Sequence, residues 1–409
     1  MNQLKTDYSE LLNRLCTVTI FSSAKNSPVL LTLSNLFKAV LKQCGDTEKL
    51  GAYADFVSTL YNEGGNLGDS IKNALFESEN IYIKLCAKKE PLPDFIKNCA
   101  SAELDLFSEL SSIASAELKS ALKASLKEPT DIFLPDFCST PYDFCTIYTE
   151  RAQKADRLGY GIFAKHGAFY FDGKNLVPYD YADGISLSDL FGYERQREQV
   201  TKNTAALTKG LPAGNLLLCG DAGTGKSSTV KAVANAFFGE GVRLVELKKH
   251  QLELLPKLMG LLSKNPLKFI IFIDDLSFNK NDDAFGALKA ALEGSASARA
   301  ENAVIYATSN RRHLIKESFS DRAGDDIHAA DTAAELMSLS QRFSLSILFE
   351  KPSKPLYLDI VASVAQKQGI PVTNGLLAKA EQYALKKGGR SARAARQFVE
   401  LVKTLGDDF

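Results

Sequence analysis

The stretch that decides the fold is Gly220-Asp-Ala-Gly-Thr-Gly-Lys-Ser227, which follows the apolar run Leu216–Cys219 and precedes a helix-prone segment that begins at Ser228. It matches the pattern G-x-x-x-x-G-K-[ST] at every fixed position. Glycines let such a loop wrap around an anion with its backbone amides pointing inward, and the N-terminus of the following helix adds partial positive charge. Strand, loop and helix together predict a phosphate-binding loop, and a chance glycine-rich turn is the less favoured alternative.

Each residue type in this loop suits a nucleoside triphosphate. We expect Lys226 to reach the β- and γ-phosphates and the Ser227 hydroxyl to join the coordination shell of Mg²⁺. The predicted cofactors are therefore ATP and Mg²⁺. The predicted nucleotide-binding residues of the loop are Gly220, Asp221, Ala222, Gly223, Thr224, Gly225, Lys226, Ser227 and Ser228.

A second pattern, Phe269-Ile-Ile-Phe-Ile-Asp274-Asp275, reads as a buried strand that ends in two acids. It suits a Walker B element, in which Asp274 would hold Mg²⁺ through water and Asp275 would orient the attacking water. Asp275 is one methylene shorter than the glutamate that many P-loop ATPases carry there, which bears on the hydrolysis rate more than on nucleotide binding. The alternative is that two acids simply end a strand.

A third strand-like run, Val304-Ile-Tyr-Ala-Thr-Ser-Asn310, also ends in a polar residue. If this strand lies next to the acid-bearing one, Asn310 is placed beside the γ-phosphate of the bound nucleotide. The alternative is that Asn310 only turns or caps the chain at the end of the strand. Arg311, Arg312 and His313 follow, and they fit contact with a neighbouring molecule as well as simple solvation.

The apolar runs of the second half of the chain alternate with helical stretches. This alternation predicts an α/β fold in which a parallel sheet is sandwiched by helices, with further helices after Lys351-Pro352. The predicted strands are Asn215–Cys219, Arg243–Leu247, Phe269–Ile273, Val304–Ala307 and Leu345–Phe349.

The first part of the chain carries apolar residues at helical spacing, notably from Ser27-Pro28 onward, over 46–61 and over 101–126. An Asp172-Gly173 pair between two apolar runs predicts a β-hairpin. With 409 residues, two or three domains are expected. We predict a mainly helical N-terminal domain (1–130), a linker with the hairpin (131–185), a nucleotide-binding αβ domain (186–351) and a helical lid (352–409).

The order and spacing of the motifs resemble those of the AAA+ P-loop ATPases. Ser186–Glu194 resembles the segment whose backbone contacts adenine, which implies nucleotide contacts at Gly192 and Tyr193. Leu339-Ser-Gln-Arg342-Phe343 resembles the box that supplies an arginine finger to the adjacent subunit, and Gly388–Arg396 resembles the sensor-2 helix of the lid. More narrowly, the strings IDDLSF, LKAALEG, YATSNRRHLI, LSLSQRF and GGRSARAARQF resemble an uncharacterised bacterial AAA+ family of predicted ATPases.

This likeness covers roughly residues 185–400 and implies roles for arginines. Arg342 would stabilise charge on the transferred phosphoryl group of a neighbouring subunit, which couples hydrolysis to assembly; the alternative is a surface arginine. Arg393 fits the sensor-2 position of the resemblance best. Arg390, one helical turn earlier, is the alternative for that role, and Arg396 is expected to be solvated. The predicted catalytic residues are Lys226, Asp274, Asp275, Asn310, Arg342 and Arg393, and the predicted metal ligands are Ser227 and Asp274.

Composition excludes several classes of protein. Lys+Arg and Asp+Glu both total 49, so the net charge is zero, which argues against a uniformly basic nucleic-acid coat protein and is compatible with self-association. Seven dispersed cysteines without a CxxC pair argue against a disulfide framework or zinc site and favour the cytoplasm. No apolar run approaches the roughly 20 residues of a membrane span, and the first residues do not resemble a secretory signal.

These observations predict an ATPase that hydrolyses ATP to remodel or load a macromolecular client, working as a homo-oligomer such as a ring. One alternative is an ATP-dependent switch or scaffold with slow turnover, which Asp275 keeps open. Another is a small-molecule kinase, which Asn310, Arg342 and Arg393 disfavour because a kinase needs an acceptor site rather than a subunit finger. Arg311, Arg312 and His313 or the basic lid leave a nucleic-acid client open, while the neutral charge and the lack of a recognisable binding module support a protein client at least as well.

Overall fold

The computed structural model describes residues 7–42, 44–128, 132–179, 184–276, 286, 288–289, 292, 300–310 and 342–406. The chain divides into two compact units, Met1–Lys165 and His166–Phe409, which we describe separately. This division places residues 132–165, which the sequence assigned to a linker, in the first unit. The hairpin falls in the second unit, and the finer four-part division stays a prediction.

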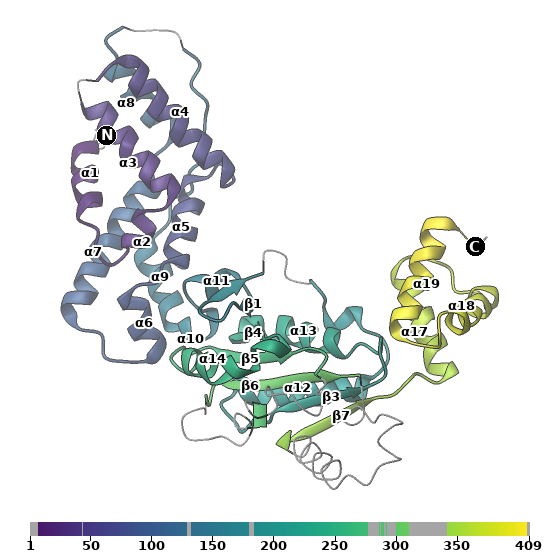
Figure 1. Ribbon diagram of the computed structural model, residues 1–409. Helices are drawn as coiled ribbons and strands as arrows, with labels where there is room; N and C mark the ends of the chain where they lie inside the picture. The colour runs from purple at the N-terminus through teal and green to yellow at the C-terminus, as the bar shows by residue number, and fades with distance from the viewer. Residues whose placement is uncertain are drawn as a thin grey trace. The chain divides into compact units, whose positions relative to one another are not determined.

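The first unit is built from helices (Figure 1). Side-chain oxygens of Asn66, Asn80 and Asp143 each accept a first-turn amide hydrogen, so the sequence itself marks where three of these helices begin. The helices are α1 (Tyr8–Thr17), α2 (Ser22–Lys25), α3 (Pro28–Leu41), α4 (Asp46–Asn62), α5 (Leu67–Glu77), α6 (Ile81–Lys88), α7 (Asp94–Ser111), α8 (Ser115–Ser125), α9 (Phe144–Gln153), α10 (Ala155–Leu158) and α11 (Ile162–Lys165).

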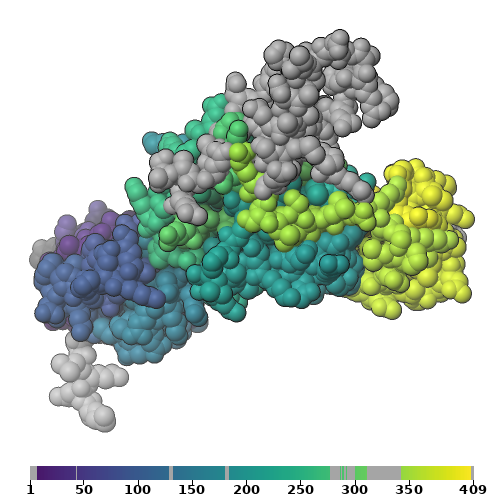
Figure 2. All heavy atoms as spheres, turned by 90° about the horizontal axis from the view of Figure 1, so that it is seen from below, coloured from purple at the N-terminus to yellow at the C-terminus, as the bar shows by residue number. Residues whose placement is uncertain are grey.

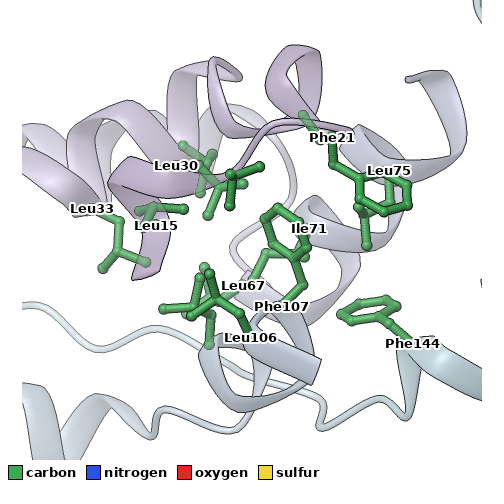
Figure 3. Close-up of a cluster of buried hydrophobic side chains, with 14 of the residues drawn as sticks. Leu15, Phe21, Leu30, Leu33, Leu67, Ile71, Leu75, Leu106, Phe107 and Phe144 are labelled. Carbon is green, nitrogen blue, oxygen red and sulfur yellow. The ribbon is translucent and has the colours of Figure 1, made fainter. Parts of the chain in front are cut away.

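Apolar side chains from α1, α3, α5, α7 and α9 meet in one core, part of which Figure 3 shows. Phe21 is fully buried in it and makes edge-to-face contacts with Phe107 and Tyr148, with ring centroids 6.1 and 4.9 Å apart. Ile71 and Leu30 are fully buried beside them. The helical periodicity of the first part of the chain therefore reports a genuine core.

The apolar stripe over 101–126 spans two helices, because the chain leaves the helical path between α7 and α8. Serines at the end of α7 bond locally: Ser111 Oγ donates to the carbonyl of Ser108, and Ser112 Oγ donates to that of Glu109. Such side chains compete with the backbone for helix carbonyls. Ile113, in the gap between the two helices, is 2% exposed and still packs in the core. The apolar residues therefore keep their spacing across a break in the helix.

The second unit contains a seven-stranded sheet in the order β2-β1-β4-β5-β6-β3-β7 (Figure 1). All five predicted strands are confirmed, and they pair in parallel. The predicted hairpin is confirmed as β1 and β2, and β1 extends the main sheet by pairing in parallel with β4. The strands are β1 (Ala168–Phe171), β2 (Leu176–Pro178), β3 (Leu216–Gly220), β4 (Val242–Glu246), β5 (Lys268–Ile273), β6 (Ala303–Ser309) and β7 (Leu345–Phe349).

Helices cover the sheet. Side chains of α12 (Glu194–Thr208) and α13 (Lys226–Ala236) join one apolar cluster with Leu216 and Ile270, while the intervening Leu217 and Ile271 face the other way and are also buried. Burial on both faces explains why β3 and β5 read as continuous apolar runs. The unit also contains α14 (Leu255–Leu262) and short 3₁₀ turns at Leu187–Asp189, Phe238–Glu240 and Lys249–Leu254.

Three helices follow the last strand: α17 (Lys354–Lys367), α18 (Asn374–Lys386) and α19 (Ala392–Leu405). Figure 2 shows β7 as a yellow-green strip that leads into these C-terminal helices. Ser353, Thr373 and Ser391 cap them, each accepting an amide hydrogen of the first turn. The α/β fold with a C-terminal helical lid and a mainly helical N-terminal part is thereby confirmed. Among the described residues, no helix combines the length and apolar character that crossing a membrane requires.

Candidate nucleotide-binding site

A pocket of about 500 Å³ lies at the carboxyl edge of the sheet, beside the lid. Ligands of open parallel sheets bind at this edge. Most of the predicted site residues line it, whereas Gly220, Asp221, Arg342 and Arg390 do not. Its lining includes Gly192, Tyr193, Arg197, Ala222 to Thr229, Asp274, Asp275, Thr308, Asn310, Phe349, Ile360, Arg393 and Arg396.

Gly220 is the point at which strand β3 turns into the phosphate loop. Its φ of +127° is one that side-chain-bearing residues rarely adopt, and a Cβ there would lie 2.1 Å from the carbonyl oxygen of Phe349 in β7. Asp221 then ties the loop to the same neighbour, because its amide donates to that oxygen over 3.1 Å. Its carboxylate accepts the Lys351 amide hydrogen over 2.8 Å. Both residues therefore shape the loop from outside the pocket.

Lys226 projects back across this loop from the first turn of α13. Its Nζ donates to the carbonyls of Gly220 at 2.9 Å and Asp221 at 2.7 Å, and to Asn310 Oδ1 at 3.1 Å. The residue is 5% exposed, and burial lowers the pKa of its ammonium group from the ordinary value. A cation held at the mouth of a helix N-terminus is suited to bind an anion.

Ser227 and Asp274 are joined directly, since Ser227 Oγ donates to Asp274 Oδ1 over 2.6 Å. With its hydrogen committed to the carboxylate, the serine oxygen still presents lone pairs. Two hard oxygen donors side by side fit Mg²⁺, which binds proteins through one or two carboxylates and completes its shell with water and substrate phosphates. No group of three or more His, Cys, Asp or Glu side chains gathers as a metal site within the described ranges.

Asp275 and Asn310 lie at the ends of the neighbouring strands β5 and β6. The Asn310 amide Nδ2 donates to Asp275 Oδ1 over 2.8 Å, and its Oδ1 accepts from Lys226. The three side chains thus form a continuous chain of hydrogen bonds from the phosphate loop to the second acid. Asp275 itself has a φ of +52°, in the left-handed region.

Among the pocket residues that sequence reasoning missed, Thr308 and Arg197 bond directly to predicted site residues. The Thr308 hydroxyl donates to the carboxylate of Asp274 and accepts the amide hydrogen of Asp275, the two acids that follow β5. Arg197 of α12 donates through Nη1 to the carbonyl of Gly192 and pairs with Glu194 at 3.1 Å. Thr308 lies within the quoted run that ends at Asn310, but no motif gives either residue a role, because both act through neighbours that only the folded chain supplies.

Gly192 and Tyr193 lie in the pocket wall, as the predicted adenine-side contacts. Both have positive φ, +72° and +60°, so the chain makes a sharp turn immediately before α12. Tyr193 is buried and its hydroxyl donates to the carbonyl of Glu350 over 2.7 Å, just beyond β7. Burial raises the pKa of this phenol. The turn is therefore anchored to the strand that leads into the lid.

The lid arginines fall into two groups. Arg393 and Arg396 line the pocket, and the Arg393 amide donates to the carbonyl of Gly223 in the phosphate loop over 3.0 Å. Arg390 instead forms a bidentate pair with Glu381 of α18, which lowers the pKa of that carboxyl. Of the two sensor-2 candidates, the geometry favours Arg393.

Arg342 lies away from the pocket of its own chain. It precedes β7, whose first residue, Leu345, pairs with Leu216 at the start of β3 and whose last residue, Phe349, pairs with Gly220. The five residues of β7 span roughly 16 Å, so Arg342 is at the opposite end of the strand from the phosphate loop. The basic residues Arg311, Arg312 and His313 lie outside the described residues.

Residues 164–405 match the family described as "Protein of unknown function (DUF815)". The chain belongs to this family. The phosphate loop at the end of β3 and the parallel sheet agree with the AAA+ P-loop fold that the sequence resembles.

Several solved structures are similar to the chain. Thermotoga maritima RuvB, a Holliday junction branch migration motor, is 14% identical over 54% of this chain and 64% of its own, with a TM-score of 0.36. The FIGL-1 AAA domain in complex with ADP is 17% identical over 55% of this chain and 76% of its own, with a TM-score of 0.37. PCH-2 of C. elegans is 17% identical over 55% and 66%, with a TM-score of 0.35. The chain thus spans less than two thirds of RuvB, and no curated protein matches it.

Proposed function

We propose that this protein binds ATP with Mg²⁺, hydrolyses it to ADP and phosphate, and uses the reaction to remodel or load a macromolecular client. The observation that carries the proposal is the convergence of Lys226, Ser227, Asp274, Asp275 and Asn310 on one pocket, from three separate strand ends. Phosphoryl transfer needs positioning and charge stabilisation more than covalent chemistry, and these side chains supply both.

Each side chain has a defined part in this reaction. Lys226 would turn from the loop carbonyls toward the phosphates, which exchanges two neutral acceptors for anionic ones. Ser227 and Asp274 would hold Mg²⁺, which when bound neutralises phosphate charge. Asp275, oriented by Asn310 over 2.8 Å, would align the attacking water.

Hydrolysis in this scheme requires a second subunit. Arg342 lies at the far end of β7 from its own phosphate loop, so its guanidinium would act on nucleotide held by a neighbour in a homo-oligomer. Zero net charge, from 49 basic and 49 acidic residues, is compatible with such self-assembly.

The lid would convert the state of the nucleotide into movement. Helix α19 of the lid is bonded to the phosphate loop, because the Arg393 amide donates to the Gly223 carbonyl. Just before the first lid helix, the Lys351 amide donates to the Asp221 carboxylate. A phosphate that rearranges the loop therefore acts on two lid contacts at once. We propose a protein client, because the neutral charge gives no general attraction to nucleic acid.

The direct test measures ATP binding by calorimetry and phosphate release by the purified full chain, with Lys226→Ala as the inactive reference. Mixing two inactive variants tests the finger. Asp275→Asn keeps Arg342 but lacks the acid, and Arg342→Ala keeps the acid but lacks the finger. Recovered turnover in the mixture supports a shared site, whereas turnover by Arg342→Ala alone contradicts it.

A nucleotide-dependent switch with slow turnover is the second candidate. The favouring observation is that the short Asp275 carboxylate is already engaged by Asn310. Tight ATP binding and ATP-dependent assembly without phosphate release would support the switch over the ATPase.

A further inference from the structure

Thr308 is a residue for which no motif assigns a role, yet it makes three hydrogen bonds to three consecutive residues after β5. Its Oγ1 bonds Asp274 Oδ1 at 2.5 Å and the amide of Asp275 at 2.9 Å. Its carbonyl oxygen accepts the Leu276 amide hydrogen at 2.7 Å. The residue is 2% exposed and lines the nucleotide pocket.

The direction of these bonds follows from the donors. A backbone amide only donates, so the Thr308 oxygen accepts from Asp275 and its single hydrogen must go to Asp274. Asp274 Oδ1 therefore receives two hydroxyl hydrogens, one from Thr308 and one from Ser227. Both donors act on the same oxygen, which fixes the orientation of the carboxylate that would bind the cation.

The same hydroxyl fixes the backbone at Asp275. This residue has a φ of +52°, which is uncommon for a residue other than glycine and requires support from its surroundings. The bond from the Asp275 amide to Thr308 supplies that support. In this conformation the Asp275 carboxylate meets Asn310 Nδ2 at 2.8 Å.

We propose that Thr308 is a positioning residue that couples the two acids: one hydroxyl orients the metal ligand Asp274 and anchors the backbone of the water-orienting Asp275. This role rests on the proposed function. Through Thr308, metal binding at Asp274 and orientation of the attacking water by Asp275 depend on each other. Asp275 meets Asn310 from an unusual backbone conformation, so the amide bond to Thr308 bears on where its carboxylate lies.

The test compares Thr308→Val, Thr308→Ala and Thr308→Ser in the full chain. Valine keeps the shape and removes the hydroxyl. We expect the turnover number to fall about tenfold or more, and the Mg²⁺ concentration for half-maximal turnover to rise by about the same factor. Affinity for ATP in EDTA should stay within about twofold of wild type, because Lys226 and the loop are untouched. Thr308→Ser keeps the hydroxyl and should restore both quantities.

Thr204→Val is the matched control. Thr204 is a fully buried threonine of the same unit whose hydroxyl bonds Tyr306 and the carbonyl of Val200, away from the pocket. It should leave the Mg²⁺ dependence unchanged. If Thr308→Val destabilises the unit, Thr308→Ala and Thr308→Ser are compared instead, since they also differ in the presence of the hydroxyl.

The outcomes separate the two proposals. Normal Mg²⁺ dependence and turnover in Thr308→Val overturn the role of Thr308 while leaving the ATPase intact, and so does a serine variant as impaired as valine. If wild type binds ATP without turnover, hydrolysis is refuted, and the Mg²⁺-induced gain in ATP affinity then serves as the readout: its loss in valine alone supports Thr308. Absence of ATP binding by wild type refutes both.

Discussion

Replacing Gly220 with alanine tests whether the phosphate loop depends on the close approach of β3 and β7. The new Cβ would lie 2.1 Å from the carbonyl oxygen of Phe349, and Cβ contacts under 3.0 Å are essentially never seen. The two strands must therefore separate by about 0.9 Å at this point. The carbonyl oxygen belongs to the backbone, so no side-chain rotation can relieve the clash.

The expected cost has two parts. Holding a non-glycine residue at a φ of +127° contributes about 1–3 kcal/mol. Separating the strands stretches the 3.1 Å bond from the Asp221 amide to Phe349, whose loss contributes about 0.5–1.5 kcal/mol. We expect Gly220→Ala to lower the free energy of unfolding of the second unit by about 2–4 kcal/mol. ATP affinity should fall as well, because Lys226 bonds to the Gly220 carbonyl.

Hydrogen exchange of peptides from β3 and β7 across a urea series measures this unit separately from the helical one. Calorimetry with ATP reports the site. Gly260→Ala is the matched control, because a Cβ at this α14 position meets nothing within 4 Å, and it should be neutral or stabilising by about 0.5–1 kcal/mol. A Gly220→Ala protein within about 0.5 kcal/mol of wild type, with full ATP affinity, would refute the steric argument.

Two further predictions concern the lid. Arg393→Ala should weaken ATP binding about tenfold, whereas Arg390→Ala should leave the affinity unchanged in calorimetry because its guanidinium pairs with Glu381; equal losses would contradict this assignment. Asp189 accepts a hydrogen bond from Lys367 of α17, which lowers the pKa of the Asp189 carboxyl. A depressed folded-state pKa stabilises the fold above the unfolded value of about 4, and this stabilisation is lost as the pH falls from there through the lower folded-state value. The stability gap between wild type and Asp189→Asn in thermal melts should therefore be present at neutral pH and close in acid; a gap independent of pH would contradict it.

The sequence alone determined the parts of this protein that depend on neighbours in the chain. The phosphate loop is readable because glycines, lysine and serine must follow one another between a strand and a helix. Strands β3, β5 and β6 are readable because burial on both faces makes them almost continuously apolar. The break between α7 and α8 was not readable, because Ile113 keeps the apolar spacing while serines end the helix.

Only the tertiary structure decided which side chains act together. Strand β3 lies between β6 and β7, which follow it far along the chain, and this order places Asp274, Thr308 and Asn310 at one edge. Thr308 has no local signature because its role exists only through the register of β6 beside β5. The choice of Arg393 over Arg390 likewise depends on Glu381, an acid on another helix. Local sequence sets backbone conformation, whereas pairing between distant segments sets the distances on which the chemistry depends.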